Sequence, residues 1–407
     1  MSSATDLEAT YDAMSIRGIA TVADMGLEIH HSSLRGLKAV SEDRIAIEEC
    51  KLGVLIAIFD GHYADDLSDY AGKVLPRQLC DRISRDVSLS DTTDMSSSVE
   101  KALIAGIEEF DASLLNDVLK HFPQGADTDW NDPFWDDSGE VYEVIGYSKE
   151  DPVFCAARRT IVGATALVAF IDRAKRNVWV ASLGDSEAVL GRTIGDDLQV
   201  LFHSDLHSTN NPSEAARLQA EHPDEPPVIY DGRVLGRLPL TRALGDFQLK
   251  VSLALSTRVL EWAYPSYLGD NEIEDWTRDG HTHPPYLSST PTVRQHALLP
   301  GDVLVLSSDG LRLALEDLGG EDGKTRAMFA FAHGGVLGAA ASAPYAELLG
   351  HPLTEPTAGE NVADRVIRNA LFGADEAKMR DAFASTHADP DYYRDDISVV
   401  VVRLPQD

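Results

Sequence analysis

Residues 53–62 read GVLIAIFDGH, a short and continuous apolar run that ends in Asp60, Gly61 and His62. A run of this length, rich in branched side chains and closed by a turn signal, predicts a strand buried on both faces rather than a helix. Runs of the same kind recur along the chain. They are Ala164–Ile171, Val178–Leu183, Val303–Leu306 and Ile397–Val402.

Amphipathic segments lie between these runs. Residues 97–120 carry apolar side chains at steps of three and four, the spacing of a helix with one buried face. Residues 211–214 read NPSE, which predicts a capped helix start with proline in the first turn. Residues 67–74 have helical character, and we expect Pro76 to interrupt that helix.

The fold class follows from how closely two of the apolar runs succeed each other. The run Val178–Leu183 begins too soon after Ala164–Ile171 for a helical crossover, so both are predicted to form an antiparallel hairpin around Asp172–Asn177. Interspersed helices and antiparallel strands indicate an α+β fold and not a doubly wound parallel sheet. We expect a tail over residues 1–20 and one domain over residues 21–407.

Three stretches of that domain have the composition of surface insertions. The first is acidic and is expected to be a solvated loop, the second is rich in Pro, Tyr and His, and the third is rich in Gly and Ala. They lie near residues 126–151, 263–292 and 319–360.

The chain is strongly acidic. It has 407 residues, with 35 Lys and Arg against 67 Asp and Glu, which gives a formal net charge of −32. Nucleic-acid binding needs clustered basic side chains, and an anionic membrane attracts them, so neither partner is expected. No apolar run approaches the roughly 20 residues of a membrane-spanning helix.

The cysteines and the start of the chain carry a prediction about the compartment. Cys50, Cys80 and Cys155 are far apart and form no CxxC pair, which favours buried, reduced thiols in an intracellular protein. The first 30 residues are acidic, unlike a signal peptide or a mitochondrial presequence. We therefore expect a cytoplasmic or nuclear protein.

Carboxylates recur where the apolar runs begin or end. The aspartates are Asp60, Asp185, Asp309 and Asp395, and Glu42 and Asp43 precede the Arg44–Ile47 approach to the first run. A single Asp-Gly after a strand is usually only a turn. Several carboxylates at one sheet edge repel one another and stay ionised together only with a cation. Oxygen ligands without paired His or Cys favour Mg²⁺ or Mn²⁺ over Zn²⁺.

Seven short motifs follow one another along the chain. They are Ser41-Glu42-Asp43-Arg44, Phe59-Asp60-Gly61-His62, Gly163-Ala164-Thr165-Ala166, Leu183-Gly184-Asp185-Ser186, residues 240–246 (LTRALGD), Ser307-Ser308-Asp309-Gly310-Leu311 and Arg394-Asp395-Asp396-Ile397-Ser398. With these motifs in this order the sequence resembles the metal-dependent protein phosphatase 2C family, and within it the pyruvate dehydrogenase phosphatase branch. The resemblance implies a four-layer α-β-β-α sandwich of two antiparallel sheets flanked by helices. It also implies a protein serine/threonine phosphatase, with two-metal hydroxide attack on phosphoserine and phosphothreonine.

The resemblance further implies roles for the carboxylates. Asp60 bridges two Mg²⁺ or Mn²⁺ ions, the Gly61 carbonyl binds one of them, and Asp309 and Asp395 complete the pair. Glu42 and Asp43 act partly through water, and Asp185 corresponds to a weaker third site.

Two further side chains have roles by the same resemblance. His62 protonates the departing serine or threonine oxygen, a role for which a histidine beside a turn has a structural alternative. Lys38 takes the place of an arginine that grips the phosphate in many members, although it could equally be a plain surface lysine.

The sequence departs from the family pattern close to these motifs. Tyr63 and Ala64 replace glycines, Glu187 replaces an arginine, and Leu313 replaces a carboxylate that would support the third metal. These changes motivate two alternatives, a pseudophosphatase that keeps the fold and binds partners, and a phosphohydrolase of small molecules. For the phosphatase we expect a phosphorylated protein substrate and a monomer, and the resemblance adds mitochondria as a competing location.

Overall fold

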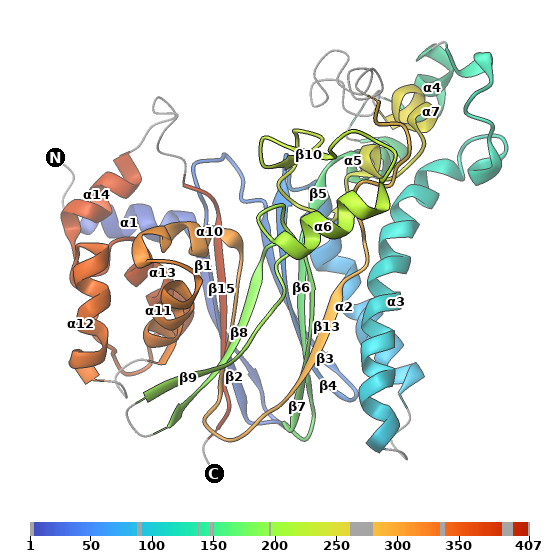
Figure 1. The fold of residues 1–407 in the computed structure, drawn as a ribbon. Helices are drawn as coiled ribbons and strands as arrows, with labels where there is room; N and C mark the ends of the chain where they lie inside the picture. Colours follow the sequence, from blue (N-terminus) through green and yellow to red (C-terminus); the bar gives the residue numbers. More distant parts are fainter. Residues whose placement is uncertain are drawn as a thin grey trace.

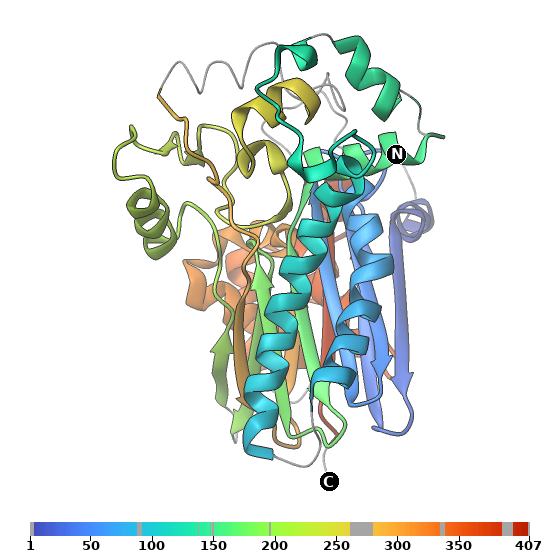
Figure 2. The same ribbon diagram turned by 90° about the vertical axis from the view of Figure 1, so that its right-hand side faces the viewer.

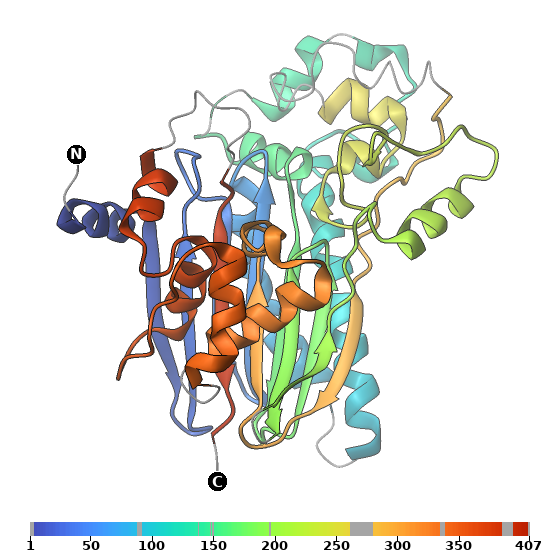
Figure 3. The same ribbon diagram turned by 60° about the vertical axis from the view of Figure 1, so that its left-hand side comes forward.

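Two antiparallel sheets pack face to face, and helices cover the outer face of each (Figure 1). The computed structural model describes residues 4–87, 92–136, 138–146, 148, 150–194, 197–260, 280–333, 338–384 and 394–405. Figure 2 shows α2 and α3 lying along one sheet, and Figure 3 shows the C-terminal helices over the other. This arrangement confirms the predicted α+β sandwich of four layers.

The first sheet has six strands in the order β1-β2-β15-β14-β8-β9. They are β1 (Ser15–Val22), β2 (Leu27–Leu34), β15 (Ile397–Arg403), β14 (Val303–Ser307), β8 (Glu187–Ile194) and β9 (Asp197–His203). The second sheet has seven strands in the order β12-β5-β4-β6-β7-β13, with β3 paired to β4. They are β3 (Asp43–Cys50), β4 (Gly53–His62), β5 (Gly163–Ala164), β6 (Ala166–Asp172), β7 (Asn177–Leu183), β12 (Leu244–Gly245) and β13 (Thr292–Ala297). A short ribbon joins β10 (Ile229–Tyr230) to β11 (Arg233–Val234).

The helices fall into three groups. The second sheet is covered by α2 (Asp66–Asp86), α3 (Thr92–Leu119) and α5 (Pro152–Ile161). The first sheet is covered by α1 (Ala4–Met14), α10 (Asp309–Ala314), η5 (Glu316–Leu318), α11 (Glu321–His333), α12 (Gly338–Leu349), α13 (Val362–Leu371) and α14 (Glu376–Ala384). Around the upper end in Figure 1 lie η1 (Gly125–Asp127), η2 (Pro133–Asp136), α4 (Ser138–Ile145), α6 (Pro212–Glu221), η3 (Phe247–Leu249), α7 (Leu253–Leu255) and η4 (Ser256–Leu260).

The continuous apolar runs are strands with two buried faces, as the sequence predicts. In β4, Ile56 and Ile58 pack between the sheets, whereas Leu55 and Phe59 pack under α2 and α3. The predicted hairpin is also present, since β6 pairs antiparallel with β7 from Ala166 opposite Leu183 onward. Because side chains alternate along a strand, burial on both sides needs apolar residues at every position.

The expected break at Pro76 is wrong. Helix α2 continues through this residue for 21 residues in all. Proline in a helix interior is unfavourable by about 3 kcal/mol. The turns beyond it bury Leu79 and Ile83 completely, and burial of such a side chain is worth about 1.5–3 kcal/mol. Packing against the sheet therefore outweighs the local penalty.

The described parts of residues 1–20 and 319–360 form more helix and strand than the sequence suggested. The described part of the expected tail forms α1 and much of β1, with Tyr11 fully buried. The described part of the Gly- and Ala-rich stretch forms α11 and α12. In α11, Phe329 is buried against β8 of the first sheet, and Phe331 is buried beside Tyr345 of α12. Composition alone misled here because α11 also carries large apolar side chains that are buried in the core.

The acidic stretch also differs from expectation. The acidic stretch 126–151 contains η1, η2 and α4, and its Trp130 and Trp135 pack on Phe122, so it is not simply a solvated loop. Most of the stretch 263–292 lies outside the described residues.

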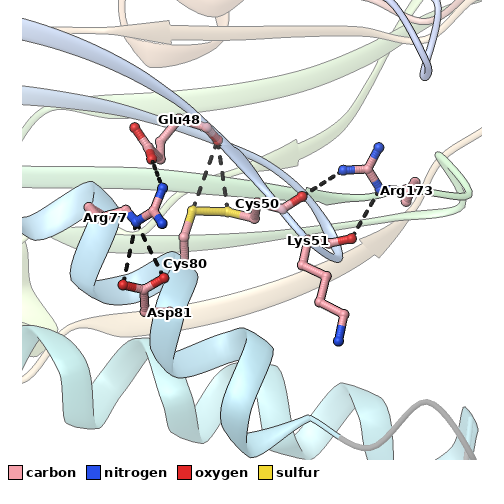
Figure 4. Close-up of a disulfide and its surroundings, with 7 residues drawn as sticks. All are labelled: Glu48, Cys50, Lys51, Arg77, Cys80, Asp81 and Arg173. Atoms are coloured by element: carbon pink, nitrogen blue, oxygen red, sulfur yellow. Dashed lines mark hydrogen bonds and ion pairs between the residues drawn. A yellow bond between two sulfur atoms is a disulfide. The ribbon is translucent and has the colours of Figure 1, made fainter.

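Cys50 and Cys80 form a disulfide, so the expectation that these thiols are reduced is wrong for this pair (Figure 4). The bond joins the last residue of β3 to α2, and the Cα atoms are 5.2 Å apart. Cys155 is partly buried and lies outside this disulfide. The sequence could not show the pairing because 30 residues separate the two cysteines and only the docking of α2 on β3 brings them together.

Candidate active site

The carboxylates that the sequence singled out gather at the upper end of the sandwich, where α10 follows β14 and β15 begins (Figure 1). Asp60 lies near the end of β4, and Asp43, the first residue of β3, is its direct partner in the β3–β4 ladder. Like charges directly opposite each other on neighbouring strands destabilise a sheet. Because this pair of charges does not stabilise the sheet, it indicates a functional role for the two aspartates.

Electrostatic effects tie the other aspartates to this pair. Burial, followed by the charges of Asp43 and Asp309, raises the pKa of Asp60 well above its ordinary value. Burial, followed by the charges of Asp185 and Asp395, does the same to the pKa of Asp309. The structure thus brings together residues from β3, β4, β14–α10, the β7–β8 turn and the start of β15.

The same environment affects the flanking acidic side chains. Burial raises the pKa of Asp43 to about 7 and that of Asp185 to about 6. Burial also raises the pKa of Glu42, against the opposing effect of the Lys38 ammonium. Carboxyl groups held this far from their ordinary pKa are expected where a cation normally balances the charge.

The donor set fits a hard divalent cation. Glu42 and Asp43 are buried, whereas Asp60, Asp309 and Asp395 remain partly accessible. Asp43 Oδ1 is buried with no hydrogen-bond partner among the described residues, while its Oδ2 accepts a 2.8 Å bond from Ser308. In the described part of the chain, no three His, Cys, Asp or Glu side chains have the spacing of a formed metal site.

Lys38 lies among these carboxylates. Its ammonium pairs with Glu42 and lies 3.5 Å from Asp395 Oδ1. In this position the lysine neutralises part of the charge of the cluster, so it is not a plain surface residue.

Asp396 supports the site through the backbone. Its carboxylate accepts 2.6 Å bonds from the Gly36 and Glu42 amides, which ties the start of β15 to the segment that carries Lys38. Asp396 belongs to the motif at residues 394–398, but the sequence did not predict a role for it.

His62 at the end of β4 has a buried acidic partner. Its Nε2 lies 2.7 Å from Oδ2 of Asp246, a residue with no exposed surface. Burial alone lowers the pKa of His62, but the Asp246 carboxylate outweighs it, and the net pKa is raised. Asp246 is the last residue of the motif at 240–246, but the sequence did not predict that it pairs with His62.

The close approach of His62 and Asp246 depends on Gly163. A Cβ atom at this position would lie 2.1 Å from both His62 Nε2 and Asp246 Oδ2. Farther back, Asp111 of α3 accepts a 2.7 Å bond from the Gly245 amide and pairs with Lys250 at 2.8 Å. Buried polar groups thus fix the turn that carries Asp246.

The family departures have visible structural consequences. Tyr63 is 43% exposed and contacts the His62 ring edge to face, with 5.3 Å between the ring centroids. Glu187 is buried and lies 3.5 Å from Arg312, so a positive charge lies beside this position despite the missing motif arginine. Burial raises the pKa of Asp185, and the nearby charges of His62 and Arg312 offset only part of that effect. A cation beside Asp185 and an exposed Leu313 both disfavour a third metal.

Comparison with known proteins supports the class that this fold and site define. The family model "Protein phosphatase 2C" matches residues 141–317. The human pyruvate dehydrogenase phosphatase 2, named as mitochondrial, is 34% identical over 260 residues, which cover 59% of this chain and 47% of that protein. The human pyruvate dehydrogenase phosphatase 1 is 38% identical over 162 residues, covering 39% of this chain and 30% of that protein.

A more distant sequence relative and a solved structure are also similar to this chain. A probable protein phosphatase 2C from Arabidopsis thaliana is 27% identical over 283 residues, covering 67% of this chain and 52% of that protein. A solved phosphatase structure from Toxoplasma gondii shares the fold, with a TM-score of 0.51, 17% identity and 96% coverage of both chains. Over residues 141–317 the chain is similar to the protein phosphatase 2C family, and it resembles the pyruvate dehydrogenase phosphatase branch. It spans only about a third to a half of the length of these curated relatives.

Proposed function

We propose that this chain is a metal-dependent protein serine/threonine phosphatase. The observation that carries the proposal is the meeting of Asp60, Asp43 and Asp309, with raised pKa values, at the sheet end that also presents the His62–Asp246 pair. A cluster of carboxylates of this kind can bind divalent cations. A protonated imidazole beside it can donate a proton to a leaving oxygen.

The metal ligands we propose are Asp60, Asp309 and Asp395, the Gly61 carbonyl, and Glu42 and Asp43 acting partly through water. Asp185 is the proposed ligand of a weak third site. When bound, Mg²⁺ or Mn²⁺ would supply charge that balances the phosphoryl oxygens and lowers the pKa of water. Asp396 and Ser308 hold the ligand segments through the bonds described above.

His62 is the proposed general acid. Asp246 holds the imidazole by one nitrogen and favours its protonated form, so a proton is available for the serine or threonine oxygen near neutral pH. Tyr63 borders His62 on the exposed side, where it would narrow the approach of a phosphorylated segment. Lys38 is proposed to meet the phosphate while its charge is shared with Glu42 and Asp395.

The proposed substrate is a phosphorylated protein, and the proposed assembly is a monomer that binds neither nucleic acid nor membrane. No helix in the described ranges is long and apolar enough to span a bilayer. The proposed location is the cytoplasm or nucleus. Mitochondria, printed in the names of the pyruvate dehydrogenase phosphatases, are the competing location, and fractionation distinguishes the two.

Turnover of a phosphoserine or phosphothreonine peptide tests the function. We expect hydrolysis with Mn²⁺ or Mg²⁺ that stops with a chelator and falls at least about 100-fold in Asp309→Asn. The matched control is Asp81→Asn, an exposed carboxylate on α2 whose loss should leave the rate unchanged.

Two results would count against the proposal. Hydrolysis that survives both the chelator and Asp309→Asn would exclude this site as the centre. No turnover together with no bound metal would favour the pseudophosphatase, and turnover of small phosphate esters alone would favour the small-molecule hydrolase.

A further inference from the structure

A cavity lies far from the carboxylate cluster. It has a volume of about 510 Å³ and opens where the β6–β7 hairpin, the turn after β3 and the first part of α3 meet. Leu52 lines it, and Asp60 is eight residues farther along the same strand direction. At about 3.3 Å per residue, this places the cavity about 26 Å from the metal ligands. We call it the hairpin cavity.

The inner wall of the hairpin cavity is apolar. Trp179 lines it and is only 1% exposed. Leu52 and Met95 line the same cavity. Such a wall is suited to a ligand with an apolar body.

The rim of the hairpin cavity is positive, although the chain as a whole has about twice as many acidic as basic residues. Lys51, Arg173 and Arg176 line it, against the single acidic residue Asp172. Both oxygens of Asp172 are engaged in the hairpin turn, at 2.8 Å from the Arg176 amide and from the Asn177 side chain.

The three cations differ in what already binds them. The Arg173 guanidinium is bound to Asp24 and to the Cys50 and Lys51 carbonyls, and Figure 4 shows the two carbonyl bonds. The side chains of Lys51 and Arg176 form no ion pair within the described residues. Two cations are therefore available at the mouth of an apolar cavity.

We propose that the hairpin cavity binds a small organic anion. Its apolar body lies against Trp179, Leu52 and Met95, and its anionic group faces Lys51 and Arg176. A concave apolar site with a few convergent polar groups is the usual form of a small-molecule site. The separation from the metal ligands makes this a site distinct from the phosphatase centre.

The probe for the test is 8-anilinonaphthalene-1-sulfonate, an aromatic sulfonate that fluoresces when bound, titrated into the full chain. We expect saturable binding at one site. Arg176→Glu and Lys51→Glu should each weaken it about tenfold or more, because each replaces an attractive charge with a repulsive one. Trp179→Phe should weaken it, because the smaller ring removes part of the apolar wall. N-phenyl-1-naphthylamine, the neutral analogue, should bind about tenfold more weakly.

Matched variants separate this site from general charge effects and from the active site. Lys73→Glu reverses an exposed charge on α2, and Asp309→Asn alters the carboxylate cluster, and both should leave probe affinity unchanged. Arg176→Glu should retain wild-type phosphatase activity. Affinity within about twofold of wild type in both Arg176→Glu and Lys51→Glu would overturn the proposal, as would equal affinity for the neutral analogue. These two outcomes decide the matter even if Trp179→Phe fails to fold.

Discussion

Replacing Asp246 by asparagine tests the proposed acid in depth. The change keeps the shape of the side chain but removes the charge that lies 2.7 Å from His62 Nε2. A hydrogen bond to a charged group is worth about 1.5–3 kcal/mol. At 1.36 kcal/mol per unit, its loss should lower the pKa of His62 by about one to two units.

The expected result is a shift of the pH–rate profile. A general acid is lost as pH rises through its pKa, so the descending limb of kcat should move about one to two pH units lower in Asp246→Asn. Hydrolysis of a phosphoserine peptide should slow more than that of p-nitrophenyl phosphate, because nitrophenolate leaves without a proton. Both substrates are assayed with saturating Mn²⁺ across the pH range.

Asp302→Asn is the matched control. Asp302 is also a fully buried carboxylate, paired with Arg192 at 2.9 Å, but it lies at the start of β14 away from His62. The Asp302→Asn variant should be less stable than wild type, but its pH–rate profile should not shift. An unchanged profile and an unchanged substrate preference in a folded Asp246→Asn would refute the assignment of His62 as an acid held by Asp246.

Three further changes test other parts of the structure. Gly163→Ala should separate His62 from its partner and lower kcat at least about tenfold, with a melting curve to show that the protein still folds. Glu214 has a pKa of about 2, because hydrogen bonds from arginine outweigh burial, so its stabilisation is present above about pH 4.5 and is lost as pH falls toward 2. Glu214→Gln should therefore lower the free energy of unfolding at pH 7 by at most about 3 kcal/mol, and a smaller pH dependence of stability below pH 4.5 should accompany it. Cys80→Ser should lower the free energy of unfolding by roughly 3–4 kcal/mol, because the loop closed by the disulfide is lost. Thiol counting under denaturing conditions should find one free thiol in wild type.

The buried strands were predictable because their pattern is local. Runs such as 54–59 and 399–402 have apolar side chains at every position, and only a strand covered on both sides needs that pattern. The path of α2 through Pro76 was not predictable, since the outcome depends on what Leu79 and Ile83 pack against.

The site divides in the same way. Asp60, Asp309 and Asp395 follow from their places at strand ends and from the motifs that surround them. The partner of His62 did not, because Asp246 lies 184 residues away and only the turn after β12 brings it near. The contacts of Lys38 with Glu42 and Asp395 were not predicted, because the segment from Lys38 to Glu42 is irregular and Asp395 approaches only through the packing of β15 against β3.

The central claim is that the carboxylates around Asp60 form a divalent metal site. Anomalous diffraction from crystals soaked in Mn²⁺ tests it most directly. We predict two peaks shared among Asp60, Asp309 and Asp395, and their loss in Asp60→Asn. Peaks elsewhere on the acidic surface with none at these residues, or peaks that persist in Asp60→Asn, would contradict it.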